Sequence, residues 1–176
     1  MQTVKEYEKI PLSDKDVSDF FHHQINILTY PQLSKCQTIE DVLGPYNACF
    51  ILYESRKNYG HWTLIFKTKE NELEFFNSYG GYPDLSLSHI PTEFRLKSNQ
   101  YIPYLSELII ASPYQLNYNE FKFQKEGIST CGKHCCIRLF YREFDIYEYH
   151  NMLNIIKKKT GCDYDAIVTV LYEEFS

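Results

Sequence analysis

The chain has 176 residues, of which 44% are hydrophobic and 23% are charged, and its formal net charge at pH 7 is −5. A chain of this size and composition is expected to fold as one globular domain, residues 1–176, with a sizeable core. The only dense basic run is Lys157-Lys158-Lys159, which we interpret as a solvated helix end. This charge balance argues against a protein that acts mainly on nucleic acid.

The six cysteines are interpreted as mostly free thiols in a reducing, intracellular setting. The polar start of the chain, residues 1–6, lacks a secretory signal, and no apolar run approaches the ~20 residues of a membrane span. Cys135 and Cys136 are adjacent, and adjacent side chains diverge on a helix. A metal site is not expected, because Cys131 and Cys135 have no second Cys/His pair at finger spacing beyond His134. We therefore expect no cofactor, no membrane association and no secretion.

The first predicted element in chain order is an amphipathic helix over residues 14–27. Ser13 suits its N-cap, acidic residues follow in the first turn, and apolar residues then recur at helical spacing. His22 and His23 are placed on its solvent side and are assigned no chemistry. A second, short helix is predicted over residues 38–43.

A series of strands follows. Residues 48–53, 62–66 and 72–76 are apolar runs of strand length, and the polar connection 67–71 favours a hairpin between the last two. Residues 118–123 alternate between polar and aromatic side chains, which also indicates a strand.

Helical patterns dominate the rest of the chain. A helix is predicted to begin at Thr130, two more are predicted over 146–158 and 163–174, and residues 104–110 fit a further one. The fold class is therefore expected to be α+β, with a small mixed sheet packed between helices.

Cys131 is the candidate nucleophile. It follows Thr130 and Ser129, either of which suits a helix cap, so the thiol lies in the first turn, where the helix dipole favours a thiolate. Gly132 leaves room for the close approach of a substrate backbone. The alternative is that this thiol and the two later cysteines of the helix are small core fillers.

His61 is the candidate base, because it opens a strand after Gly60 and could reach a thiol at a helix start. For a lone histidine, the alternative is an ordinary surface residue. His134 is a rival at i+3 from Cys131, but it is expected to lie along the flank of the helix.

Asn77 ends the strand that follows that of His61, and its amide oxygen could fix the tautomer and orientation of the imidazole. A turn asparagine is the alternative. Glu74 is the alternate acid, although strand alternation places it on the opposite face from Asn77.

Gln124 precedes Cys131 by seven residues and is the candidate oxyanion donor, together with the Cys131 backbone N–H. Gln115 is an alternative that lies farther from the nucleophile in the sequence.

The order and spacing of these residues resemble the adenovirus-type processing proteases (adenain) and their relatives, the SUMO-deconjugating proteases. The family pattern is His-Trp, an acidic or amide residue after an aromatic strand, and Gln six or seven residues before Cys-Gly. Here it is matched by His61-Trp62, Asn77, Gln124 and Cys131-Gly132. The resemblance covers residues 45–144. The short length and the AT-rich residue usage look like the versions carried by virophages and Polinton-type elements.

The resemblance implies a papain-like cysteine protease fold of the adenain type. It implies an endopeptidase that cleaves viral capsid or other structural precursors during virion maturation, in the virion and the host cytoplasm, and that acts as a monomer. It also implies a narrow channel across the Cys131 site, with a wall near Trp62 and a roof formed by the loop before Cys131, which admits only glycine or alanine beside the scissile bond. Trp62 and Gly132 are the expected substrate-binding residues.

The sequence departs from the family in one residue and differs from adenain in charge. Asn77 stands where the family usually has Glu or Asp, which removes charge support for the imidazolium. Adenain is basic and uses DNA and a peptide as activators, whereas this acidic chain is not expected to need DNA. The alternatives are an isopeptidase that removes a ubiquitin-like modifier and a non-catalytic protein-binding module on a protease fold.

Overall fold

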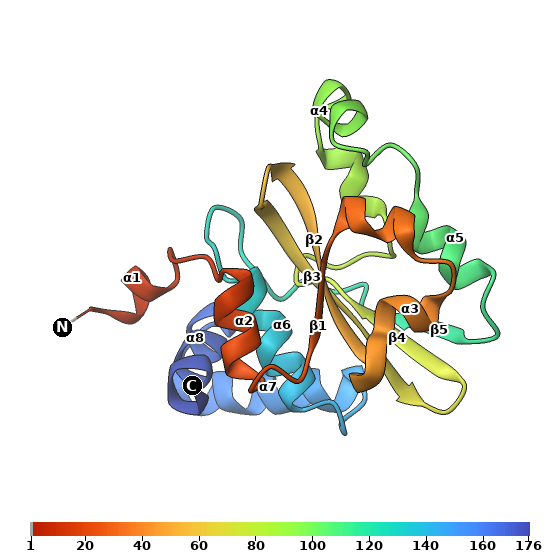
Figure 1. Ribbon diagram of the computed structural model, residues 1–176. Helices are drawn as coiled ribbons and strands as arrows, with labels where there is room; N and C mark the ends of the chain where they lie inside the picture. Colours follow the sequence, from red (N-terminus) through yellow and green to blue (C-terminus); the bar gives the residue numbers. More distant parts are fainter. Residues whose placement is uncertain (1) are drawn as a thin grey trace.

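The computed structural model describes residues 2–176, in which a five-stranded mixed sheet lies between two groups of helices (Figure 1). The strand order is β1-β2-β3-β4-β5, and the two outer pairs, β1/β2 and β4/β5, are parallel while the two inner pairs are antiparallel. The α+β class with a small mixed sheet packed between helices is therefore confirmed.

The elements have the following bounds. The strands are β1 (Asn26–Thr29), β2 (Ala48–Arg56), β3 (Tyr59–Lys69), β4 (Glu72–Phe76) and β5 (Gln115–Tyr118). The α-helices are α1 (Val4–Tyr7), α2 (Asp14–Phe20), α3 (Ile39–Leu43), α4 (Thr92–Lys97), α5 (Tyr104–Ile110), α6 (Cys131–Phe140), α7 (Ile146–Thr160) and α8 (Tyr164–Phe175). Short 3-10 helices are η1 (Tyr30–Lys35), η2 (Gly44–Tyr46) and η3 (Leu85–His89).

The sheet separates two hydrophobic cores. Helices α2, α6, α7 and α8 cover one face, and α3 and α5 lie over the other (Figure 1). Side chains alternate between the two faces, so Trp62 and Leu64 join the first core while Ile65 joins the second. Because the central strands are buried on both faces, their sequences are continuous apolar runs rather than alternating ones.

The central strands and most helices lie where the sequence predicts them. The runs at 48–53, 62–66 and 72–76 form β2, β3 and β4, and β3 and β4 pair as the predicted hairpin. The predicted helices at 38–43, 104–110, 146–158 and 163–174 correspond to α3, α5, α7 and α8. Helices α1 and α4 were not predicted.

The predicted helix over 14–27 is wrong beyond Phe20, where α2 ends. His22 and His23 have φ angles of 53° and 65°, and this left-handed backbone cannot continue a right-handed helix. The chain turns there, and residues 26–29 form β1 instead.

The predicted strand over 118–123 is also misplaced, because β5 ends at Tyr118. The side chain of Asn119 takes the place of a further strand residue. Its Oδ1 accepts from the Asn77 N–H at 3.2 Å, and its Nδ2 donates to the Asn77 carbonyl at 2.7 Å. With those backbone groups paired, the chain leaves the sheet toward the loop that precedes α6.

The six cysteines are free thiols, and Cys135 and Cys136 are completely buried in the first core. Within residues 2–176, no helix is both long and apolar enough to cross a membrane.

Candidate active site

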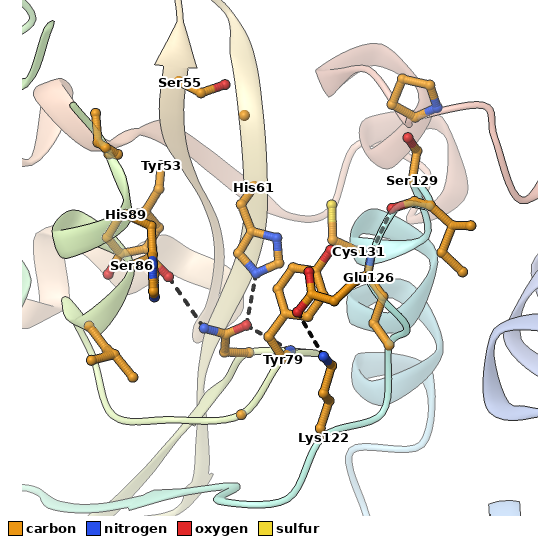
Figure 2. A pocket seen from close by; sticks show the side chains of 18 of the residues that line it. Tyr53, Ser55, His61, Tyr79, Ser86, His89, Lys122, Glu126, Ser129 and Cys131 are labelled. Carbon is orange, nitrogen blue, oxygen red and sulfur yellow. Dashed lines mark hydrogen bonds and ion pairs between the residues drawn. The ribbon is translucent and has the colours of Figure 1, made fainter.

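A cleft of about 610 Å³ opens where the start of β3, the end of β4 and the loop before α6 meet (Figure 2). His61, Asn77, Gln124 and Cys131, which the sequence singles out, all line it. Figure 2 shows the imidazole of His61 facing the side of the cleft that carries Cys131.

Cys131 is the first residue of α6 and is 7% exposed. Its backbone N–H therefore has no partner within the helix and is available to an anion. Thr130 occupies the N-cap position but makes no side-chain cap, contrary to the prediction, because its hydroxyl donates to Asp165 at 2.7 Å.

The backbone of Tyr79 determines which nitrogen of the neutral His61 imidazole carries the proton. Its N–H lies 2.9 Å from Asn77 Oδ1, and because an N–H can only donate, the oxygen of the amide must face it. His61 Nε2, which lies 2.8 Å from the same oxygen, must then carry a proton and donate. In neutral His61 this leaves Nδ1 unprotonated, as a base for the Cys131 thiol requires.

The second amide atom of Asn77 supports this orientation. Nδ2 donates to Ser86 Oγ at 3.3 Å, so η3 also holds the amide in place. The sequence did not single out Ser86, and its spacing from Asn77 gives no local signal.

The environments of Cys131 and His61 favour the thiolate–imidazolium pair. Burial alone would raise the pKa of Cys131, but its interaction with the cationic form of His61, helped by backbone donors, lowers it below its ordinary value. Burial alone would likewise lower the pKa of His61, but its interactions with Cys131 and Asn77 raise it. The pair is therefore poised to ionise together.

An aromatic stack holds the plane of the imidazole. The ring of Tyr79 lies 4.9 Å from that of His61 at 25°, and Lys122 Nζ lies 5.3 Å from the Tyr79 centroid. Lys122 also pairs with Glu126 at 2.7 Å at the rim of the cleft. Tyr79 was missed by the sequence analysis, although it follows Asn77 within the same aromatic run.

Gln124 is 2% exposed and is held at both ends of its amide. Nε2 donates to the Ile128 carbonyl at 2.9 Å, and Oε1 accepts from the Ser78 hydroxyl at 2.6 Å. The second hydrogen of Nε2 remains available to the cleft that Gln124 lines with Cys131.

Asp165, from the first turn of α8, holds the loop between Gln124 and Cys131. Besides the hydroxyl of Thr130, it accepts from the Lys125 N–H at 3.1 Å and lies 2.8 Å from His134 Nε2. Asp165 is 35 residues from Thr130, and no motif in the sequence links the two residues.

The rivals considered from the sequence lie elsewhere. His134 is completely buried against Asp165, and burial lowers its pKa. Glu74 is buried, and its carboxylate accepts two hydrogen bonds from Arg138, at 2.8 and 2.9 Å. Gln115 begins the edge strand β5, where it is exposed.

The two predicted substrate-binding residues pack against the N-terminal segment. A Cβ on Gly132 would lie 3.0 Å from a Leu12 carbon and 3.1 Å from the Trp62 ring, so the missing side chain leaves room for these two groups. The Trp62 indole is 4% exposed and donates to the Leu12 carbonyl at 2.8 Å. Contact of either residue with a substrate stays a prediction.

We call residues 7–12 the N-terminal strap. Ser129 N–H donates to the Glu8 carbonyl at 2.9 Å, and Pro11 lines the cleft. The buried ammonium of Lys133 donates to the carbonyls of Tyr7 and Ile10. The strap thus forms a wall of the site.

Across residues 2–176, no group of three or more His, Cys, Asp or Glu side chains is arranged to hold a metal ion.

No protein-family model matches the sequence. The uncharacterized protein V9 of Sputnik virophage is 48% identical over 173 residues, which cover 97% of this chain and 99% of that protein. The chain belongs to the V9 family.

Two solved structures align with this V9-family chain at low similarity. The SUMO protease Ulp1, with its catalytic cysteine oxidized to a sulfinic acid, aligns at 16% identity and a TM-score of 0.41, over 99% of this chain and 84% of that one. The central domain of the uncharacterized Lpg1148 protein from Legionella pneumophila aligns at 15% identity and a TM-score of 0.41, over 95% and 98% of the two chains.

Proposed function

We propose that this chain is a cysteine endopeptidase in which Cys131 is the nucleophile, His61 the acid–base group and Asn77 the residue that orients it. The observation that carries the proposal is the 2.8 Å contact between His61 Nε2 and Asn77 Oδ1. It fixes the tautomer that leaves Nδ1 free for a thiol whose pKa is lowered.

The reaction follows from these positions. The Cys131 thiolate attacks the scissile carbonyl carbon, and the resulting oxyanion is held by the Cys131 backbone N–H and Gln124 Nε2. The His61 imidazolium gives its proton to the leaving amine, which departs as the C–N bond breaks. Neutral His61 then takes a proton from water, whose oxygen attacks the thioester carbon; the C–S bond breaks, the acid is released, and the Cys131 thiolate and His61 imidazolium are restored.

The proposed substrates are viral capsid or other structural precursor proteins, cleaved during virion maturation. Membership of a virophage protein family supports a viral setting, and the resemblance of the four site residues to adenain supports processing of particle proteins. We place this activity in the virion and the host cytoplasm, with the enzyme acting as a monomer. The net charge of −5 supports action without DNA as an activator.

The test is to incubate the purified protein with the capsid precursors of its own element and to sequence the new termini. Wild-type protein is expected to cleave beside glycine or alanine, and Cys131→Ala is expected to remain folded and inactive. Cys135→Ala is the matched control, because it removes a buried sulfur one turn along the same helix. It is expected to lower stability by about 1–2 kcal/mol and to keep cleavage.

Three outcomes contradict the proposal in different ways. Undiminished cleavage by Cys131→Ala rules out this nucleophile. Hydrolysis confined to a ubiquitin-like C-terminus joined to lysine assigns an isopeptidase. Tight binding of precursors by the wild-type protein without any cleavage assigns a binding module.

A further inference from the structure

Ser78 is a buried residue between the active-site asparagine and the aromatic Tyr79, and its side chain contacts the proposed oxyanion donor. It is completely buried, and its hydroxyl lies 2.6 Å from Gln124 Oε1. Its carbonyl also accepts from the backbone N–H groups of Phe123 and Gln124, at 2.8 and 3.0 Å. The segment that follows β4 therefore holds Gln124 through both its backbone and a side chain.

The partners of Gln124 decide which way round its amide lies. The Ile128 carbonyl, 2.9 Å away, can only accept, so the amide nitrogen must face it. The amide oxygen then faces Ser78, and the serine hydroxyl must donate. In the reversed orientation, the Gln124 amide oxygen would face the Ile128 carbonyl oxygen. This oxygen, with its partial negative charge, would then take the place of the N–H that is offered to an oxyanion.

We propose that Ser78 is a positioning residue, whose hydroxyl fixes the Gln124 amide so that its remaining N–H is directed at the developing oxyanion. This role rests on the proposed peptidase function. The terminal torsion of glutamine is intrinsically broad, so an amide held only by Ile128 would be less well aimed. Loss of the hydroxyl would also leave a buried carbonyl oxygen without its donor.

A double-mutant cycle separates positioning from a merely structural role. Gln124→Ala removes the donor itself and is expected to lower kcat by about 100- to 1,000-fold. Ser78→Ala leaves the donor present but loosely aimed, so kcat is expected to fall by on the order of tenfold with little change in KM. In the Gln124→Ala background, Ser78→Ala is expected to cause no further fall in kcat.

Thr63→Val is the matched control for loss of a buried hydroxyl. Thr63 is also completely buried, and its hydroxyl donates to a backbone carbonyl, that of Ile51, at 3.0 Å. This variant is expected to lose stability but to keep kcat. An equal loss of kcat from Ser78→Ala with and without Gln124, or no loss at all, overturns the proposal.

The side-chain NH2 signals of Gln124 in an amide ¹⁵N spectrum provide a readout that needs no turnover. Ser78→Ala is expected to shift them and to speed their hydrogen exchange, whereas Thr63→Val leaves them unchanged. Unchanged Gln124 signals in Ser78→Ala overturn the role of Ser78 even if the wild-type protein cleaves. A wild-type protein that cleaves nothing, with the signals shifting as expected, overturns the proposed function and with it the catalytic role, but not the contact.

Discussion

Replacing Asn77 by aspartate is expected to preserve or raise activity, whereas replacing it by alanine is expected to lower kcat/KM by about tenfold. Asn77 Oδ1 accepts from both His61 Nε2 and the Tyr79 N–H. A carboxylate can accept both bonds, and the Ser86 hydroxyl, which now accepts from Nδ2, can turn to donate to it.

The magnitudes follow from the bonds that each change removes or strengthens. Alanine removes one hydrogen bond that the imidazolium donates to the amide oxygen; a bond to a charged group is worth about 1.5 kcal/mol or more, and 1.4 kcal/mol corresponds to tenfold in rate. It also leaves the Tyr79 N–H without its acceptor, which costs about 1–3 kcal/mol of stability. Aspartate adds a charge next to His61, so it raises the pKa of His61 further and stabilises the imidazolium.

The assay is the pH dependence of kcat/KM, together with the alkylation rate of Cys131 followed by mass spectrometry of its peptide. In Asn77→Asp, the alkaline limb is expected to move to higher pH, because the imidazolium persists longer. Glu74→Gln serves as a control, since Glu74 lies on the opposite face of β4 from Asn77 and its carboxylate is bound by Arg138. Wild-type kinetics in Asn77→Ala, combined with an inactive but folded Glu74→Gln, would refute the reasoning.

Further predictions concern the thiol, the loop and the strap. Because His61 lowers the pKa of Cys131, alkylation of this thiol is expected to begin at lower pH in wild-type protein than in His61→Ala; equal onsets would contradict the ion pair. Asp165→Ala is expected to lower the free energy of unfolding by about 3 kcal/mol or more in urea titrations, because it leaves the buried donors that now contact this carboxylate without an acceptor. The N-cap control Asp163→Ala is expected to cost about 1 kcal/mol, and equal losses would contradict the role of Asp165. Trp62→Phe is expected to make residues 7–12 more sensitive to limited proteolysis, and unchanged cleavage rates would mean that the indole bond does not hold the strap.

The parts of the fold that the sequence predicted are those whose signal is local. Continuous apolar runs identified β2, β3 and β4, and residue type and order picked out His61 and Cys131 before any contact was known. The failures came from geometry that hydrophobic periodicity does not encode. The left-handed His22 and His23 ended a helix whose apolar spacing continued.

Contacts between distant parts of the chain explain the remaining omissions. Ser78 reaches Gln124 across 46 residues, and Asp165 reaches Thr130 across 35. Neither partner has a spacing that periodicity or motif analysis could detect. In both cases the functional group is a small polar side chain, whose importance depends on what the folded chain brings next to it.

The N-terminal strap solvates a buried cation, the ammonium group of Lys133. Among residues 2–176, no carboxylate pairs with this ammonium, so the carbonyls of Tyr7 and Ile10 replace the water that it lost. Detaching the strap would uncover the charge two positions from Cys131 and admit water to the start of α6. The N-terminal strap is therefore expected to fold and unfold together with the segment around Cys131, so a purification tag is better placed at the opposite terminus.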